Sequence, residues 1–323
     1  MKRNKNIDLI KGLALIFVIL VHSLRYTGFY QREITGLNDI FYIFLRTIFV
    51  NCVPLFLLAT GYLMNKHVPN KKYYKGITKV IITYIIISII QTTIVNYDTL
   101  TLKLIINDIF NFTGAYYSWY VKMYIGLFLL IPYLNILYKN LKKPEKQGLI
   151  IILIIMSSLT AFKTTEIESF LPDWWNIYPL IYYFLGCYIK EYNNKNNNFK
   201  LLIAILLFNT LFNYIISCFG NFKVIMLNDY MSIFIIASSY FMFKILLNIK
   251  YKGNKIIEIL SNHSLTIYLM SYIFDLYIYK NIAIMNITIL ELIIGSTIVL
   301  ILSTIISLII DKVIKIVLNK LHP

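Results

Sequence analysis

The sequence predicts an all-α, polytopic integral membrane protein of about ten transmembrane helices, with both termini on the cytoplasmic side. Of its 323 residues, 59% are hydrophobic and only 14% are charged, and the mean hydropathy is +0.69. About a quarter of the residues in a typical soluble domain are charged. A water-soluble fold of this chain would therefore have too few charges for its surface. Apolar runs of about 18 or more residues recur along the chain, which makes residues 1–323 a single transmembrane domain.

The apolar runs define ten predicted spans. The first follows a basic N-terminal segment that resembles a signal peptide but lacks a small-x-small cleavage site, so we expect it to be retained as a helix. The two shortest spans are the fifth and sixth, which have Pro172 between them and Pro179 inside the second of the two. The spans are 8–27, 41–64, 77–97, 116–138, 148–163, 176–190, 200–218, 228–248, 262–280 and 284–310.

The basic residues set the predicted orientation. With the N-terminus inside, the six cytoplasmic segments hold 22 Lys or Arg and the five outside segments hold 6. This alternation follows the positive-inside rule, and removing one span would invert it from that point on. The formal net charge of +16 therefore reflects membrane topology and contact with anionic lipid, and we expect no nucleic acid partner.

Cysteines and histidines give no sign of a metal site. The three cysteines have no CxxC or CxxH spacing, and the four histidines are scattered. We therefore expect no metal ion, and we expect the cysteines to pack as small apolar side chains.

Five ionisable residues stand out because they lie beyond the first turn of their predicted spans, where each costs about 2.5–3.5 kcal/mol on insertion scales. With the orientation above, all five fall in the outer half of the bilayer. One interpretation is that Arg46 and Lys122 extend outward to the headgroups, with Asp275 and Glu291 close to the outer surface. The other is a polar cavity that opens to the outer face. The five residues are His22, Arg46, Lys122, Asp275 and Glu291.

The first span carries the most informative pattern. Asp8, Lys11, Leu15, Val18 and His22 follow a 3-4-3-4 spacing, which places them on one stripe of a helix. Lys11 and His22 are about 20° apart in azimuth and about 16 Å apart along the axis. One interpretation is structural: the lysine follows the positive-inside rule, and the histidine forms a hydrogen bond to a neighbouring helix. Alternatively, the imidazole is a general base in a polar cavity.

The same segment resembles the opening signature of membrane acyltransferase family 3, which includes surface-polysaccharide O-acetyltransferases. The signature D-x-x-[KR]-G-x-A-x-x-x-V-x-x-x-H is matched at every position of residues 8–22. Many members have Arg where this chain has Lys11, which keeps the charge but loses the bidentate fork.

Further blocks similar to the family's follow in the same order and cover nearly the whole chain. Two departures are Thr83, where a proline is usual, and Ser271, where histidine is common. Three residues in these blocks also have a purely structural explanation. Trp119 fits an interfacial aromatic belt, and Gly61 and Gly186 fit close packing of helices. The blocks are VPLFLLATGYL (53–63), YYKGITKVIITY (73–84), SWYVKMYIGLFLLIPYLN (118–135), YPLIYYFLGCYI (178–189) and SNHSLTIYLMSYIF (261–274).

The resemblance implies transfer of an acyl group, usually acetyl, from acetyl-CoA or another acyl-CoA to a hydroxyl of an envelope glycan or lipid-linked sugar. The donor is a substrate, so no bound cofactor is expected. Lys11, Lys75 and Lys79 would bind the CoA phosphates, with Lys11 also counted as catalytic. His22 would take the acceptor's proton or carry the acyl group. The cavity for the acceptor would be lined by Arg46, Trp119, Lys122, Asp275 and Glu291.

Two other functions fit parts of the pattern. The charges in the outer half would also suit a transporter or exporter of a polar solute or polysaccharide. A structural subunit of an envelope assembly has no specific feature in its favour. The aligned Lys11 and His22 favour the enzyme, because a transporter does not require them. The expected location is the cell membrane of a bacterium, since the excess of Ile, Asn, Lys and Tyr is typical of an AT-rich genome.

Overall fold

The computed structural model describes residues 3–159, 174–194, 198–218, 220–222, 228–280 and 288–321. Within these ranges the chain forms helices and loops, with two isolated bridges and no β-strand, so the all-α prediction is confirmed. The α-helices are α1 (Lys5–Tyr26), α2 (Leu37–Phe49), α3 (Cys52–Met64), α4 (Lys71–Lys75), α5 (Thr78–Val95), α6 (Leu102–Asn111), α7 (Trp119–Asn140), α8 (Lys143–Leu159), α9 (Tyr178–Tyr192), α10 (Phe199–Ser217), α11 (Ile233–Asn248), α12 (Lys255–Asn262), α13 (Ser264–Tyr279) and α14 (Ile289–Leu321). The short 3-10 helices are η1 (Tyr97–Thr99) and η3 (Trp174–Ile177).

A helix lies in each of the ten predicted segments, and in the described residues six stretches are long and apolar enough to cross a membrane. Helices α8, α9, α11 and α13 are shorter than these six. The count of ten spans and the side of the termini stay predictions. The six stretches are Lys5–Tyr26, Leu37–Met64, Lys71–Val95, Trp119–Asn140, Phe199–Ser217 and Ile289–Lys320.

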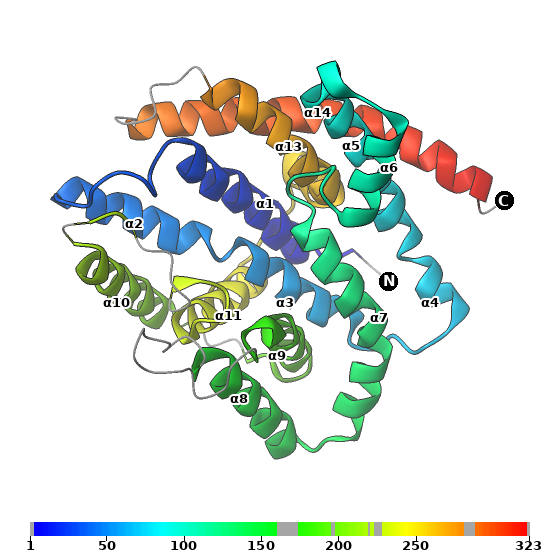
Figure 1. The fold of residues 1–323 in the computed structure, drawn as a ribbon. Coiled ribbons are helices and arrows are strands. Elements are labelled where there is room, and N and C mark those ends of the chain that lie inside the picture. The colour runs from blue at the N-terminus through cyan, green and yellow to red at the C-terminus, as the bar shows by residue number, and fades with distance from the viewer. Residues whose placement is uncertain are drawn as a thin grey trace.

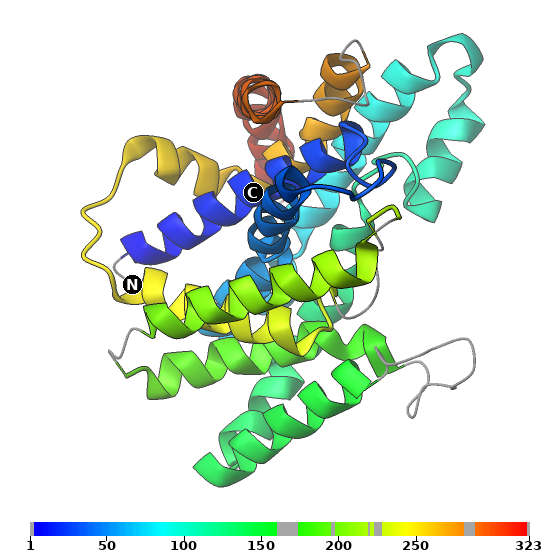
Figure 2. The ribbon, with the colours of Figure 1, turned by 90° about the vertical axis from the view of Figure 1, so that its left-hand side faces the viewer.

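Helix α1 lies at the centre of the molecule. It contacts α2, α3, α11, α12, α13 and α14. Figures 1 and 2 show α8 to α11 below α1 and the orange to red helices α13 and α14 above it. A helix in this position needs apolar side chains on several faces, and residues such as Ile10, Leu15 and Leu24 are completely buried.

The predicted second span, 41–64, is two helices and not one. The chain breaks at Val50 and Asn51, between α2 and α3. Pro54 in the first turn of α3 lacks an N–H and would clash with the carbonyl of Val50 in a continuous helix. The Asn51 amide donates to the carbonyl oxygens of Thr47 and Ile48 at 2.9 and 3.1 Å, which satisfies the end of α2.

Two glycines allow α3 and α9 to pack in backbone contact. A Cβ on Gly61 would lie 2.0 Å from the backbone oxygen of Tyr183, and one on Gly186 would lie 2.2 Å from that of Leu58. No side chain fits at either position without moving a helix. The packing interpretation of these glycines is therefore supported, and α3 is fixed as one wall of the site described next.

Candidate active site

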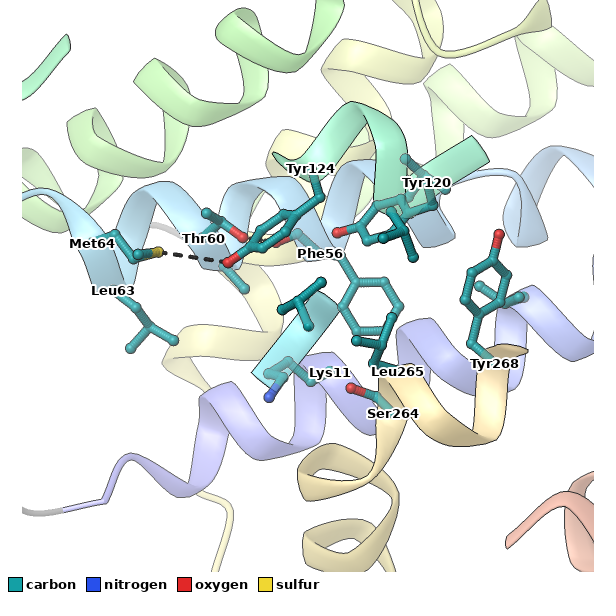
Figure 3. Close-up of a pocket in the computed structure, with 15 residues that line it drawn as sticks. Lys11, Phe56, Thr60, Leu63, Met64, Tyr120, Tyr124, Ser264, Leu265 and Tyr268 are labelled. Carbon is teal, nitrogen blue, oxygen red and sulfur yellow. Dashed lines mark hydrogen bonds between the residues drawn. The ribbon is translucent and has the colours of Figure 1, made fainter. Parts of the chain in front are cut away.

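A cavity of about 260 Å³ lies between the central helix and α3, α5, α7 and α13 (Figure 3). Most of its wall is aliphatic or aromatic, with a few hydroxyl groups and one amine. A mainly apolar pocket with a few convergent polar groups is the usual form of a small-molecule site. The lining residues are Lys11, Val18, Val53, Phe56, Ala59, Thr60, Leu63, Met64, Val80, Tyr120, Val121, Tyr124, Ser264, Leu265 and Tyr268.

The stripe on α1 faces this cavity. Lys11 and Val18 are on the wall, and Leu15 between them is fully buried. The stripe therefore passes along the cavity from its lysine toward its histidine.

Lys11 forms the charged end of the cavity. Among the described residues, its amine has no hydrogen-bond or ion-pair partner, and Figure 3 shows its nitrogen pointing away from Ser264. Asp8 does not neutralise it by direct contact, because the Asp8 carboxylate accepts from Arg3 Nε at 2.5 Å and from Ser261 Oγ at 2.9 Å. An amine of this kind is ready to bind an anion.

Tyr268 forms the opposite end and joins the cavity to His22. The rings of Tyr268 and His22 have centroids 6.0 Å apart. The Tyr268 hydroxyl donates to the backbone oxygen of Tyr117 at 2.6 Å, and the Tyr117 ring is 3.9 Å from that of His22. His22 is not itself on the wall, so it lies directly behind the aromatic end of the cavity.

Asp275 faces His22 from α13. Its Oδ2 is 4.0 Å from His22 Nδ1 and accepts a hydrogen bond from the Tyr117 hydroxyl at 2.7 Å. The Asp275 side chain is fully buried, whereas that of His22 is 16% exposed. The structure therefore brings together an imidazole, a carboxylate and a phenol from α1, α13 and the segment before α7.

Comparison with known proteins gives the family of the chain. A family model of an acyltransferase domain, Acyl_transf_3, matches residues 4–311. The chain belongs to acyltransferase family 3. Together with the six apolar stretches, this membership makes it a multi-pass membrane acyltransferase. No curated protein and no solved structure matches the chain.

The two further lysines predicted to bind the donor of this acyltransferase lie on the Lys11 side. Lys75 ends α4 and Lys79 is in the first turn of α5, and both side chains are exposed. Lys79 is close enough for its charge to act on Lys11, and the next residue, Val80, lines the cavity. Lys75 is not on the cavity wall.

Two of the residues predicted for the acceptor cavity contact the segment 228–230. Arg46 is buried and donates from Nη1 to the backbone oxygen of Asn228 at 2.5 Å. Trp119 is 40% exposed, and its ring stacks on Tyr230 with centroids 5.9 Å apart. Neither residue lines the cavity.

The last two predicted cavity residues lie apart from it. Lys122 is exposed, although its neighbour Val121 is on the cavity wall. Glu291 is exposed in the first turn of α14, where its carboxylate accepts from the backbone N–H of Thr288 at 2.8 Å. The structure gives Glu291 a helix-capping contact and leaves Lys122 on the outer surface of the helices.

Sequence reasoning missed the aromatic residues that shape the site. Tyr120 and Tyr124 are four residues apart on α7, as Ser264 and Tyr268 are on α13, and the spacing that aligns residues on one helix face could have found them. Tyr117 precedes α7 and has no such signal. Across the described ranges, no group of three His, Cys, Asp or Glu side chains could hold a metal ion.

Proposed function

We propose that this acyltransferase moves an acyl group, in the simplest case acetyl, from acyl-CoA to a hydroxyl of a cell-envelope glycan or lipid-linked sugar. One observation carries the proposal: the cavity leads from Lys11, which has no hydrogen-bond or ion-pair partner in the described ranges, to the aromatic end beside His22. We place the protein in the bacterial cell membrane. There acyl-CoA is on the cytoplasmic side of the bilayer and the envelope glycan is on the outer side.

The charge and length of acyl-CoA indicate that it binds with its phosphates at the Lys11 end of the cavity. Acyl-CoA carries phosphates at one end of a long, flexible arm and a thioester at the other. Lys11 and the nearby Lys79 supply positive charge for the phosphates. The arm would then lie in the apolar cavity, because Lys11 and His22 are separated by about 16 Å along the helix.

The chemistry proceeds at His22. The neutral imidazole removes the proton from the acceptor hydroxyl as the oxygen attacks the thioester carbonyl. The tetrahedral intermediate then collapses, the carbon–sulfur bond breaks, and the imidazolium returns its proton to the CoA thiolate. A new ester bond has formed, one thioester has been lost, and the histidine is unchanged.

The acceptor would approach from the opposite end of the bundle. A second pocket, of about 110 Å³, lies at the end of α5 remote from Lys79 and includes Asn96, Tyr116 and Tyr272. The Asn96 amide has no hydrogen-bond partner in the described part of the chain, so it can bind a hydroxyl. The Tyr272 ring is 5.3 Å from that of Tyr117, which in turn contacts His22. Aromatic rings and an amide are suited to the faces and hydroxyls of a sugar.

The proposal is tested by mass spectrometry of envelope glycans. A strain without the gene should lose one acyl mass on one surface polymer, and the wild-type gene should restore it. A His22→Ala protein should restore about 1% or less of the wild-type rate, because a general base contributes about 100-fold or more.

A matched control is His67→Ala, which removes an exposed histidine outside the site. It should restore acylation fully. If the deletion strain keeps every acyl group, the proposed reaction is wrong. If His22→Ala protein accumulates normally and restores acylation, the role of His22 is wrong.

A further inference from the structure

His22 and Asp275 leave complementary atoms without partners in the centre of the protein. His22 Nδ1 and Asp275 Oδ1 are both buried, and neither has a hydrogen-bond partner among the described residues. Nδ1 and the other carboxylate oxygen, Oδ2, are 4.0 Å apart. Buried polar atoms without partners are uncommon in folded proteins, because each has lost its hydrogen bond to water. The unpartnered Nδ1 faces a carboxylate that also has one unpartnered oxygen, which indicates an interaction that forms in another state of the site.

A small movement would bring the two groups into contact. A hydrogen bond between nitrogen and oxygen spans about 2.7–3.2 Å, so the gap must close by about 1 Å. Hydrogen bonds at active sites are often long without substrate and shorten when it binds. The contact would require the imidazole to rotate toward α13.

Tyr117 fixes the carboxylate on its other side. Its hydroxyl donates to Asp275 Oδ2 at 2.7 Å, and its ring covers the face of His22 at 3.9 Å. The hydroxyl of Tyr268 holds the Tyr117 backbone in turn. The carboxylate is therefore oriented before any substrate binds, and the imidazole lies against the Tyr117 ring.

We infer that Asp275 is the positioning residue of His22: its carboxylate accepts the Nδ1 hydrogen and holds the tautomer whose Nε2 lone pair takes the proton of the acceptor. The 16% of the His22 side chain that is exposed cannot include the buried Nδ1. The exposed part of the side chain therefore lies away from Nδ1, and the proposal requires that it include Nε2. When Nε2 gains the proton, Asp275 also neutralises the imidazolium.

This inference rests on the proposed function, and Asp275→Asn tests it. The amide keeps the shape and can still accept from Tyr117, but it has no charge. We expect kcat to fall about 100-fold or more, as for other aspartates that orient a catalytic histidine. The KM for acyl-CoA should stay the same, because Lys11 at the other end of the cavity is untouched.

Two further variants separate positioning from general damage to the fold. Asp275→Glu restores the carboxylate and should recover part of the kcat that Asp275→Asn loses. Tyr117→Phe removes one hydrogen bond to the carboxylate and should lower kcat about tenfold. An Asp275→Asn protein with normal kcat, or a loss that affects only KM, would overturn the inference.

A spectroscopic test does not depend on activity. The chain has four histidines, so ¹⁵N-histidine labelling gives few signals, and the one absent in His22→Ala belongs to His22. The wild-type protein should show hydrogen on Nδ1, and Asp275→Asn should shift the population toward Nε2. Hydrogen on Nε2 in the wild-type protein contradicts the inference. If the deletion strain keeps every acyl group, the proposed function fails, and if His22→Ala is active, the catalytic role of His22 fails. An active Asp275→Asn beside an inactive His22→Ala removes only the role of Asp275.

Discussion

At the scale of single residues, the site depends on which charged groups are already paired. Asp8 is bound by Arg3 and Ser261, and Arg46 is bound to the backbone of Asn228. Lys11 and His22 have no such partner among the residues that the structure describes, although both are partly buried. Lys11 is therefore able to bind an anion, and His22 is able to accept a proton.

The role proposed for Lys11 predicts a specific loss of donor binding. Lys11→Met keeps the length of the side chain and removes its charge. We expect KM for acyl-CoA to rise about tenfold to 100-fold, the range for losing one hydrogen bond to a charged group. Steady-state kinetics of the purified protein measure this change, with kcat affected less than KM.

Two controls accompany Lys11→Met. One removes a different lysine charge, and the other keeps the charge at position 11. Lys66→Met removes an exposed charge away from the cavity wall and should leave KM unchanged. Lys11→Arg restores the charge and should bind acyl-CoA at least as well as lysine, since a guanidinium can contact phosphate with two N–H groups. Equal KM values for Lys11→Met and the wild type would show that the cation does not bind the donor.

At the scale of helices, the wall of the cavity depends on how closely α3 and α9 approach. Gly61 and Gly186 let each helix contact the backbone of the other. Six residues on α3 line the cavity, so a shift of this helix would change its shape. The Asn135 amide also donates to the backbone oxygens of Met64 and His67 at 2.8 Å each, which fixes the end of α3 against α7.

This packing predicts that Gly186→Ala destabilises the protein. The new Cβ would lie 2.2 Å from Leu58 O and 2.9 Å from Tyr62 N, both backbone atoms that cannot turn away. We expect a loss of about 1–3 kcal/mol, the usual cost of overpacking. Thermal unfolding in detergent measures it as a lower midpoint.

Gly126→Ala is the matched control, because a Cβ there has no heavy atom within 4 Å. It should leave the midpoint unchanged or raise it, as alanine favours a helix by about 1 kcal/mol over glycine. If Gly186→Ala is as stable as Gly126→Ala, α3 and α9 are not in the close backbone contact described above.

At the scale of the whole molecule, the proposed reaction requires the two ends of the bundle to face opposite sides of the membrane. Lys79 and Asn96 lie at opposite ends of α5, about 25 Å apart along the helix. The first is near the charged end of the large cavity and the second lines the small pocket. The predicted orientation places the Lys11 end in the cytoplasm, where acyl-CoA is made.

The orientation is tested by labelling introduced cysteines in intact cells. In a chain whose three native cysteines are replaced, Tyr97→Cys should react with a membrane-impermeant maleimide added outside. Lys66→Cys should react only after the cells are made permeable. Both positions are exposed, so a lack of reaction is not due to burial. The reverse pattern would contradict the orientation, and labelling of both from one side would contradict the alternation of the spans.

The sequence by itself determined the helical membrane fold, the position of a helix in each predicted segment and the stripe from Lys11 to His22. These features follow from hydropathy and helical periodicity, which act along one chain segment at a time. It did not show the break between α2 and α3, although Pro54 was a local signal for it.

Only the tertiary structure decided which polar groups meet. Of the residues predicted for the outer half, Asp275 faces His22, Arg46 and Trp119 contact residues 228–230, and Lys122 and Glu291 lie elsewhere. Tyr117, with no periodic signal, links His22 to Asp275. The reason is physical: spacing gives the face of a helix that a residue occupies, but the partner of that face depends on contacts between helices far apart in the sequence.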